Sequence, residues 1–212
     1  MGPTSCPAPL TRLRIKISEI WNSIPAQLAR ENKKFKYSNV SKGGRALKFE
    51  SAIEWLEKAG FVYTVKNLKT PKRPLSGYVD RSKFRLSMLD SGLLGAMLDI
   101  HSRVIVRGNS LFSEYNGAFI ENYAASELIK SGFQELFYWT SKYEAEVDFV
   151  ITNGDNKIIP IEVKSGLSRQ KKSLRVYDEK YNPEIMVRLS PRNFIQDKNF
   201  VNIPLYAIPV LV

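Results

Sequence analysis

Three charged residues interrupt two apolar runs in the stretch EAEVDFVITNGDNKIIPIEVKSG, which spans residues 144–166. Asp148 lies in the first run, and Glu162 and Lys164 lie in the second. Two neighbouring carboxylates repel each other unless a cation lies between them or one of them keeps a proton. Carboxylate oxygens suit Mg²⁺ or Mn²⁺, and a nearby lysine can orient a metal-bound water or stabilise charge on a phosphate. These residue types therefore indicate hydrolysis of a phosphodiester.

The spacing of the three residues predicts that they share one face of a β-hairpin. EVDFVI and KIIPIEVK read as two strands around the polar turn TNGDN. A turn centred on Asp155 places Asp148 across from Glu162. Because side chains alternate between the two faces of a strand, Glu162 and Lys164 face the same way. The simpler alternative is three unrelated charges on the open face of the hairpin, but their position inside apolar runs favours a convergent site.

Glu121 is a fourth candidate for this site. The segment 117–130 has a helical pattern, and Glu121 shares a face with the apolar stripe of Ala124, Ala125 and Leu128. We expect this stripe to pack on a sheet. A glutamate at such a position costs free energy unless it reaches a partner, and the predicted metal site supplies one.

Single copies of two residue types limit the chemistry. The only cysteine, Cys6, excludes an intramolecular disulfide and a zinc site built from several cysteines. The only histidine, His101, leaves little room for a histidine metal site or a Ser/His/Asp triad, and we expect it in a loop or at a helix end. No GxxxxGK[ST] motif is present, so we expect no ATP site in this chain.

No segment of the sequence resembles a membrane anchor or a leader peptide. No apolar run approaches the roughly 20 residues that cross a bilayer. The first residues, MGPTSCPAPL, lack the charged and apolar regions of a signal peptide. We therefore expect no contact with a membrane and a cytoplasmic location.

Positive charge is concentrated in the first part of the chain. The 32 basic and 21 acidic residues give a net charge of +11. The whole excess lies in the first 90 residues, and the remainder is neutral. This asymmetry predicts a basic N-terminal module that meets a polyanion. The alternative is a solvated basic surface without a partner.

The N-terminal pattern is typical of a winged helix-turn-helix. We expect helices at residues 11–21, 22–34 and 45–60, followed by strands at 61–68 and 82–90. In this arrangement the third helix reads the major groove, and the tip of the hairpin contacts the backbone. Two basic clusters occupy these places, one around the start of the third helix and one at the hairpin tip: Lys33, Lys34, Lys36, Lys42, Arg45 and Lys48, and then Lys69, Lys72 and Arg73. DNA is therefore the expected partner, although winged helices also bind proteins.

The remaining segments complete an alternation of helices and strands. We expect a short apolar helix at 91–100, which joins the two halves, an exposed helix at 168–183, and strands at 184–190 and 202–212. The last segment, NIPLYAIPVLV, is apolar enough to form either core or a homodimer interface, and core is the favoured interpretation.

The pattern Asp148…Glu162-Val163-Lys164, with Glu121 upstream, resembles the PD-(D/E)XK phosphodiesterase signature of restriction-endonuclease-like and Holliday-resolvase-like folds. The chain is also similar to the C-terminal domain of unknown function that follows the P-loop module in a large family of predicted prokaryotic AAA-type ATPases. The matching segments run in order through most of residues 12–212: SIPAQLARENKKFKYSNVSK, AIEWLEKAGFV, FRLSMLDSGLLGAML, GAFIENYAASEL, YWTSKYEAEVDFVI and PIEVKSG. The ATPase module of that family has no counterpart in these 212 residues.

The resemblance implies a mixed α/β chain with a tail at 1–10, a basic winged-helix domain at 11–100 and a nuclease-like domain at 101–212. It implies that Asp148, Glu162 and the carbonyl of Val163 hold Mg²⁺ or Mn²⁺, with Lys164 at the water and Glu121 as an auxiliary acid. The expected function is metal-dependent cleavage of DNA. The alternative is a non-catalytic module that binds DNA or docks on a P-loop ATPase.

Overall fold

The computed structural model describes residues 8–30, 33–100, 110–142, 145–166 and 172–211. The single cysteine, Cys6, and the single histidine, His101, lie outside these ranges. Among the described helices, none is both long enough and apolar enough to cross a bilayer.

One continuous helix, α1 (Ala8–Leu28), replaces the first two helices expected from the sequence. Ser23 and Pro25, which were expected to start the second helix, lie inside α1. The Ser23 hydroxyl donates a 2.8 Å hydrogen bond to the carbonyl of Ile20 instead of capping a new helix. The chain stays helical after the proline, since the N–H of Ala29 bonds to the carbonyl of Pro25 at 3.1 Å. The predicted break was therefore wrong, because one buried stripe runs through both segments.

The rest of the N-terminal half follows the expected order of a helix and a hairpin. Its elements are η1 (Tyr37–Asn39), α2 (Ala46–Lys58), β1 (Val62–Leu68), η2 (Leu75–Tyr78), β2 (Val79–Met88) and α3 (Ser91–Met97). The helix α2 buries Phe49, Ala52, Ile53 and Leu56, the stripe that its sequence pattern predicted.

The C-terminal half begins with the long helix α5 (Ser110–Lys130) and continues with strands and one further helix. These are β3 (Leu136–Thr140), β4 (Glu146–Thr152), β5 (Ile158–Val163), α6 (Lys172–Tyr181), β6 (Met186–Ser190), β7 (Ile195–Asp197), β8 (Phe200–Pro204) and η3 (Leu205–Leu211). The expected strand over 202–212 was wrong after Pro204. The chain turns there into η3, which contains Pro209 and buries Ile208 in the core.

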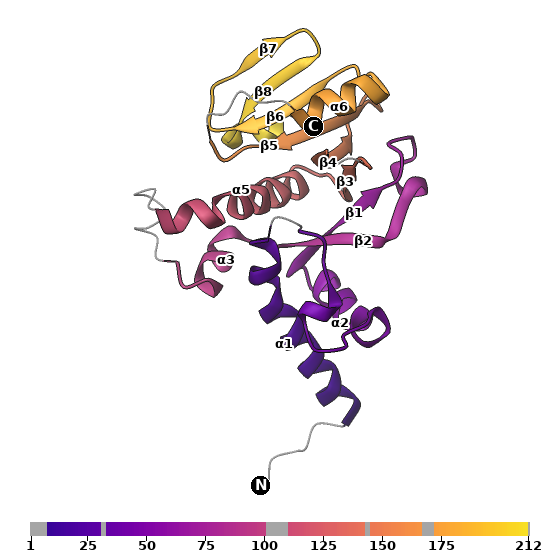
Figure 1. The fold of residues 1–212 in the computed structure, drawn as a ribbon, viewed down its shortest axis with the longest axis vertical. Coiled ribbons are helices and arrows are strands. Elements are labelled where there is room, and N and C mark those ends of the chain that lie inside the picture. The colour runs from indigo at the N-terminus through magenta and orange to yellow at the C-terminus, as the bar shows by residue number, and fades with distance from the viewer. Residues whose placement is uncertain (1–7, 31–32, 101–109, 143–144, 167–171, 212) are drawn as a thin grey trace.

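All described strands join one mixed sheet, so the chain is α/β as the sequence predicted. The strand order is β2-β1-β3-β4-β5-β6-β8-β7. The hairpin β1–β2 continues directly into the C-terminal half, because β1 pairs in parallel with β3 from Val65 and Leu136 to Leu68 and Trp139. In Figure 1, α1 and α2 lie below α5, and the strands β5 to β8 lie above it.

Helices cover both faces of the C-terminal sheet. Ala124, Ala125 and Leu128 of α5 pack with Ile161 and other residues in one core. Leu174 and Tyr177 of α6 form a second core on the opposite face with Trp139, Val147 and Phe200. A third core lies between α1, α2 and β2.

Asn122 ties α5 to the N-terminal half. Its side-chain carbonyl accepts a 2.7 Å hydrogen bond from the N–H of Met88, and its amide donates a 3.1 Å bond to the carbonyl of the same residue. The side chain of Asn122 is buried and satisfies both backbone groups at the end of β2. These two hydrogen bonds fix α5, and with it Glu121, against β2.

Candidate functional site

The register of the β4–β5 hairpin places Asp148 beside the end of β5. Phe149 pairs with Ile161 and Ile151 with Ile159, which confirms a hairpin centred on Asp155. The carboxylate oxygen Oδ2 of Asp148 accepts a 2.8 Å hydrogen bond from the backbone N–H of Val163. Asp148 is therefore fixed next to the peptide unit that follows Glu162.

The carboxylate of Glu162 is held by two cations. Its Oε1 lies 3.1 Å from Nζ of Lys164, and its Oε2 lies 3.5 Å from Nη2 of Arg188, its register partner on β6. Only 2% of Glu162 is exposed. Burial raises the pKa of Glu162, with a further increase from Asp148, and Lys164 and Arg188 act in the opposite direction. The negative charge of this carboxylate is thus costly despite its two partners.

Glu162 lies on the face of β5 that points away from α5. Its neighbours Ile161 and Val163 pack in the core beneath α5, so strand alternation directs Glu162 to the face with α6. Arg188 lies on this face too, with its guanidinium carbon 5.3 Å from the ring centre of Phe200 in the α6 core.

Glu121 lies on α5, and its side chain forms an ion pair with Lys33. Burial and the charge of Asp148 raise the pKa of Glu121, Lys33 and Arg85 lower it, and the net result is a pKa of about 7. Asp148 thus acts electrostatically on both Glu121 and Glu162. Of the four residues expected to meet, Glu162 contacts Lys164 and Glu121 contacts Lys33. Asp148 bonds to the N–H of Val163 and influences both glutamates only through its charge.

Arg85 on β2 is a buried cation that was not among the residues predicted for the site. It forms an ion pair with Glu146, and its guanidinium carbon lies 4.1 Å from the ring centre of Tyr138. The charges of Glu146, Glu121 and Asp148 raise the pKa of Arg85 against the opposing effect of burial. It brings positive charge from the N-terminal half to the carboxylates of the C-terminal half.

Arg85 and Arg188 were both missed, although a signal for them was present. Arg85 in FRLSM and Arg188 in MVRLS interrupt apolar runs just as Asp148 and Glu162 do. A basic residue in a buried strand needs a carboxylate partner as much as an acidic one needs a cation. The same criterion, applied to both signs of charge, would have found them.

The donor set of this site fits a hard divalent cation. Asp148, Glu162 and the carbonyl of Val163 offer oxygen ligands of the kind that Mg²⁺ and Mn²⁺ prefer. The raised pKa values of Glu162 and Glu121 indicate that neighbouring protein cations leave part of the negative charge uncompensated. No cluster of three or more His, Cys, Asp and Glu side chains suited to a metal occurs within the described ranges. A cation here would therefore depend on the two carboxylates and on the backbone.

The predicted DNA-binding residues lie mostly on the surface. Seven are exposed: Lys36, Lys42, Arg45, Lys48, Lys69, Lys72 and Arg73. Lys33 and Lys34 are half-buried, and Lys33 is engaged with Glu121. Arg73 donates a 2.7 Å hydrogen bond to the carbonyl of Asn156 in the β4–β5 turn. The connection between β1 and β2 therefore touches the hairpin that carries Asp148 and Glu162.

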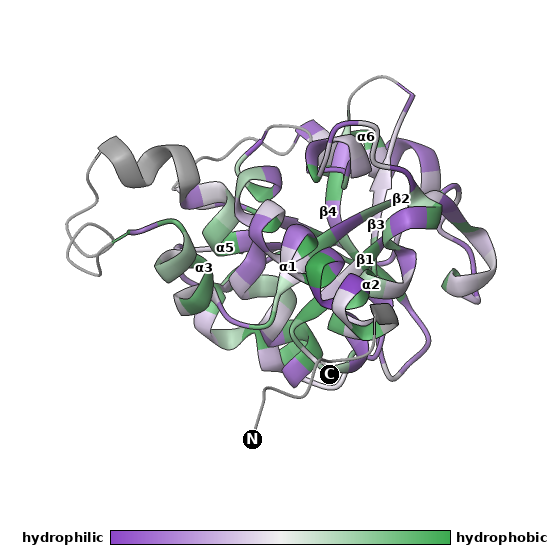
Figure 2. Ribbon diagram, turned by 90° about the horizontal axis from the view of Figure 1, so that it is seen from below, coloured by the Kyte–Doolittle hydropathy of each residue, from purple (hydrophilic) through white to green (hydrophobic). Residues whose placement is uncertain are grey.

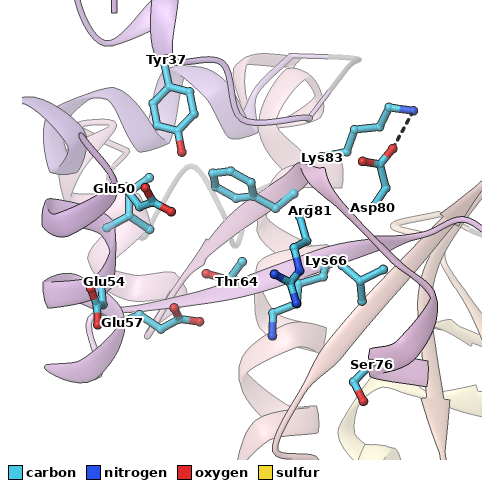
Figure 3. A pocket seen from close by; sticks show the side chains of 13 residues that line it. Tyr37, Glu50, Glu54, Glu57, Thr64, Lys66, Ser76, Asp80, Arg81 and Lys83 are labelled. Carbon is cyan, nitrogen blue, oxygen red and sulfur yellow. Dashed lines mark ion pairs between the residues drawn. The ribbon is translucent and has the colours of Figure 1, made fainter. Parts of the chain in front are cut away.

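The helix α2, which was expected to contact the bases of DNA, carries a row of three glutamates, here called the acidic wall. Glu50, Glu54 and Glu57 of α2 line a cleft of about 530 Å³, and Arg81 and Lys83 of β2 line it as well (Figure 3). Carboxylates on a recognition helix repel the phosphates of DNA, because both are negatively charged. The basic residues that precede α2 suit DNA better than this wall does.

Two family models, each describing a domain of unknown function, match successive parts of the sequence. Residues 116–208 match the domain of unknown function DUF4143, and residues 10–104 match the domain of unknown function DUF8612. DUF4143 is found in AAA-ATPase-associated proteins. The match supports an ATPase-associated domain over α5 and the strands that carry Asp148 and Glu162.

A solved structure aligns with most of the chain but at low similarity. It is a complex of McrB AAA+ hexamers with bound McrC from Thermococcus gammatolerans, with 12% identity over 89% of this chain and 73% of that chain and a TM-score of 0.29. A TM-score this low supports no inference about fold or function. No curated protein matches the chain.

Proposed function

We propose that this ATPase-associated chain carries a Mg²⁺- or Mn²⁺-dependent site that cleaves a phosphodiester of DNA. The observation that supports the proposal is the position of Asp148, fixed by Val163 N–H beside Glu162, which Lys164 contacts. Two carboxylates and a lysine at one strand end are the side chains that such a reaction needs. The exposed cations around the start of α2 and in the connection between β1 and β2 would hold the DNA backbone.

Each residue has a distinct role in this proposal. Asp148, Glu162 and the carbonyl of Val163 would hold the cation, which supplies polarisation of the phosphate and a lowered pKa of bound water. Lys164 orients the attacking water or stabilises charge on the phosphate. Glu121, with a pKa of about 7, can take up or release a proton near neutral pH and acts as the auxiliary acid.

Cleavage of supercoiled plasmid and of a branched DNA junction, with Mg²⁺ or Mn²⁺ and with chelator, tests the proposal. We expect nicking that requires the cation and that falls by at least about 100-fold in Lys164→Ala. The control is Lys157→Ala, because Lys157 lies after the β4–β5 turn and pairs with Glu184. Equal traces of cutting by wild type and Lys164→Ala, independent of metal, would identify a contaminant and end the proposal.

A second candidate is a non-catalytic module that docks on a P-loop ATPase. It is favoured by the acidic wall of α2 and by the pairing of Glu162 with Arg188, which gives the carboxylate a structural partner. This candidate predicts binding without turnover. A helpful variant replaces Glu50, Glu54 and Glu57 with glutamine. A large gain in affinity for duplex DNA would show that α2 faces DNA, and an unchanged affinity would favour a protein partner for this wall.

A further inference from the structure

An apolar groove lies between α1 and the end of α2, far along the chain from the acidic site. It encloses about 770 Å³. Its lining is Leu10, Leu13, Arg14, Ile17, Ser18, Trp21, Trp55, Leu56 and Phe61. Several of these side chains remain open to solvent, with exposed fractions of 52% for Leu10, 45% for Trp55 and 40% for Phe61. In Figure 2 these two helices lie toward the viewer and carry apolar residues beside hydrophilic ones.

Three aromatic rings line the groove and contact one another. The ring centres of Trp21 and Phe61 lie 5.7 Å apart in an edge-to-face contact, and those of Trp55 and Phe61 lie 6.3 Å apart in a stack. This mutual packing holds the rings in place before any partner binds. Exposed apolar patches with ordered tryptophans are typical of protein interfaces, where such residues supply most of the binding free energy.

The length of the groove and the two helices that border it favour a helical occupant. Along α1, the lining residues Leu10, Leu13, Ile17 and Trp21 recur every three or four positions. They extend over three turns, or about 16 Å. A groove between two helices with this period accepts the apolar stripe of a third helix. An occupant that fills it needs about 12 residues.

The charge in the groove predicts the charge on the flank of that helix. Arg14 is the only charged residue among the lining side chains. The one acidic residue of α1, Glu19, does not line the groove and lies 4.0 Å from Lys48. Acidic side chains on the occupant would therefore gain from α1, and basic ones would be repelled.

We propose that the groove of α1 and α2 docks an amphipathic helix of a partner protein, about three turns long, whose flank toward α1 is acidic. The inference does not rest on the phosphodiester site, because the groove shares no residue with it. Loss of metal binding at Asp148 and Glu162 would leave this docking unchanged, and loss of docking would leave the metal site unchanged.

Binding of two matched helical peptides to the full chain tests the proposal. Both are stapled and fluorescein-labelled, about 12 residues long, with leucine at every third or fourth position. One carries glutamates on a flank and the other carries lysines there. We expect the glutamate peptide to bind at least about tenfold more tightly in fluorescence anisotropy, with a shift of tryptophan emission. Arg14→Glu should reverse the preference.

Surface variants locate the binding. Trp55→Ser and Phe61→Ser should each weaken the glutamate peptide by at least about tenfold, since both side chains are accessible in the groove. Tyr206→Ser is the control, because Tyr206 is 75% exposed on η3 outside the groove. Circular dichroism would verify that the variants fold. Equal binding of the two peptides, no binding of either, or an equal weakening in the control would overturn the proposal.

Two further measurements exclude other occupants. A bimane label on Cys6, the only cysteine, is quenched when it meets a tryptophan. Quenching that Trp55→Phe relieves would show that the chain's own first residues fill the groove. Sedimentation at several concentrations would detect a second copy. A dimer that Trp55→Ser dissociates would assign the groove to self-association, and either result would replace the proposed partner helix.

Discussion

Asp148 accepts a 2.8 Å hydrogen bond from the backbone N–H of Val163, so the carboxylate keeps one position beside β5. Asparagine can accept the same hydrogen bond without the charge. We therefore expect Asp148→Asn to keep the fold and to weaken Mn²⁺ binding by at least about tenfold in calorimetry, since the ligand is no longer negatively charged. Asp148→Ala also removes the hydrogen bond and should unfold with a free energy about 1–3 kcal/mol lower. Unchanged Mn²⁺ binding in both variants would contradict the assigned ligand.

The buried pair of Glu162 and Arg188 predicts a strong effect of removing only one partner. Arg188→Met leaves the Glu162 carboxylate buried with Lys164 alone. We expect the free energy of unfolding in urea to fall by about 3–5 kcal/mol. Adding Glu162→Gln to this variant should recover most of that stability, because the unpaired charge is then removed. An additive decrease in the double variant would show that Arg188 acts mainly through other neighbours.

The raised pKa of Glu121 predicts a specific dependence of stability on pH. The folded chain holds the Glu121 proton up to about pH 7, whereas an unfolded glutamic acid releases it near 4.5. The folded state binds more protons within this window, so the free energy of unfolding falls as the pH rises from about 4.5 to 7. We expect the wild type to lose up to about 3 kcal/mol across this window relative to Glu121→Gln. Urea unfolding at several pH values measures it.

Glu127→Gln is the matched control for that measurement. Glu127 lies on the same helix and pairs with the exposed Lys130 at 2.8 Å. Parallel pH profiles of the wild type and Glu121→Gln, or a change in Glu127→Gln as large as that in Glu121→Gln, would assign the pH dependence to other groups.

The basic residues around the start of α2 predict salt-dependent binding of DNA. Replacing Lys42, Arg45 and Lys48 with alanine removes up to three cations that can neutralise phosphates. We expect the slope of log K against log salt concentration for a short duplex to decrease by about 0.9 for each phosphate that is no longer neutralised. Fluorescence anisotropy over a series of salt concentrations measures the slope. The control replaces three exposed cations of α6, Lys172, Arg175 and Lys180. No difference between the two triple variants would remove this segment from the DNA interface.

The sequence predicted the local geometry of the site better than its surroundings. The register of β4 and β5 followed from the alternation of side chains and from a turn centred on Asp155, because the pairing of a hairpin is determined within a few residues. That Glu162 and Lys164 face the same way followed from alternation along one strand, and in the structure the two side chains form an ion pair. The pairing of Glu162 with Arg188 depends on the crossover from β5 to β6 through α6, which local patterns do not specify.

The N-terminal half shows a second limit of sequence patterns. Ser23 and Pro25 are helix-start residues by type, yet α1 continues through them because its stripe of Ile20, Ile24 and Leu28 is buried throughout. Tertiary packing here outweighs local preference. Likewise, no pattern within β1 announces its parallel partner β3, which lies about 70 residues further along the chain.

The pairing of β1 with β3 joins the two parts of the chain that the family models match separately. Residues 10–104 and 116–208 match separate domain models, yet a single ladder of hydrogen bonds crosses from one to the other. Separating the two halves would break both this ladder and the two hydrogen bonds between Asn122 and Met88. A displacement of β1 would therefore act on β3 through this ladder, and β3 is the strand next to β4, which bears Asp148.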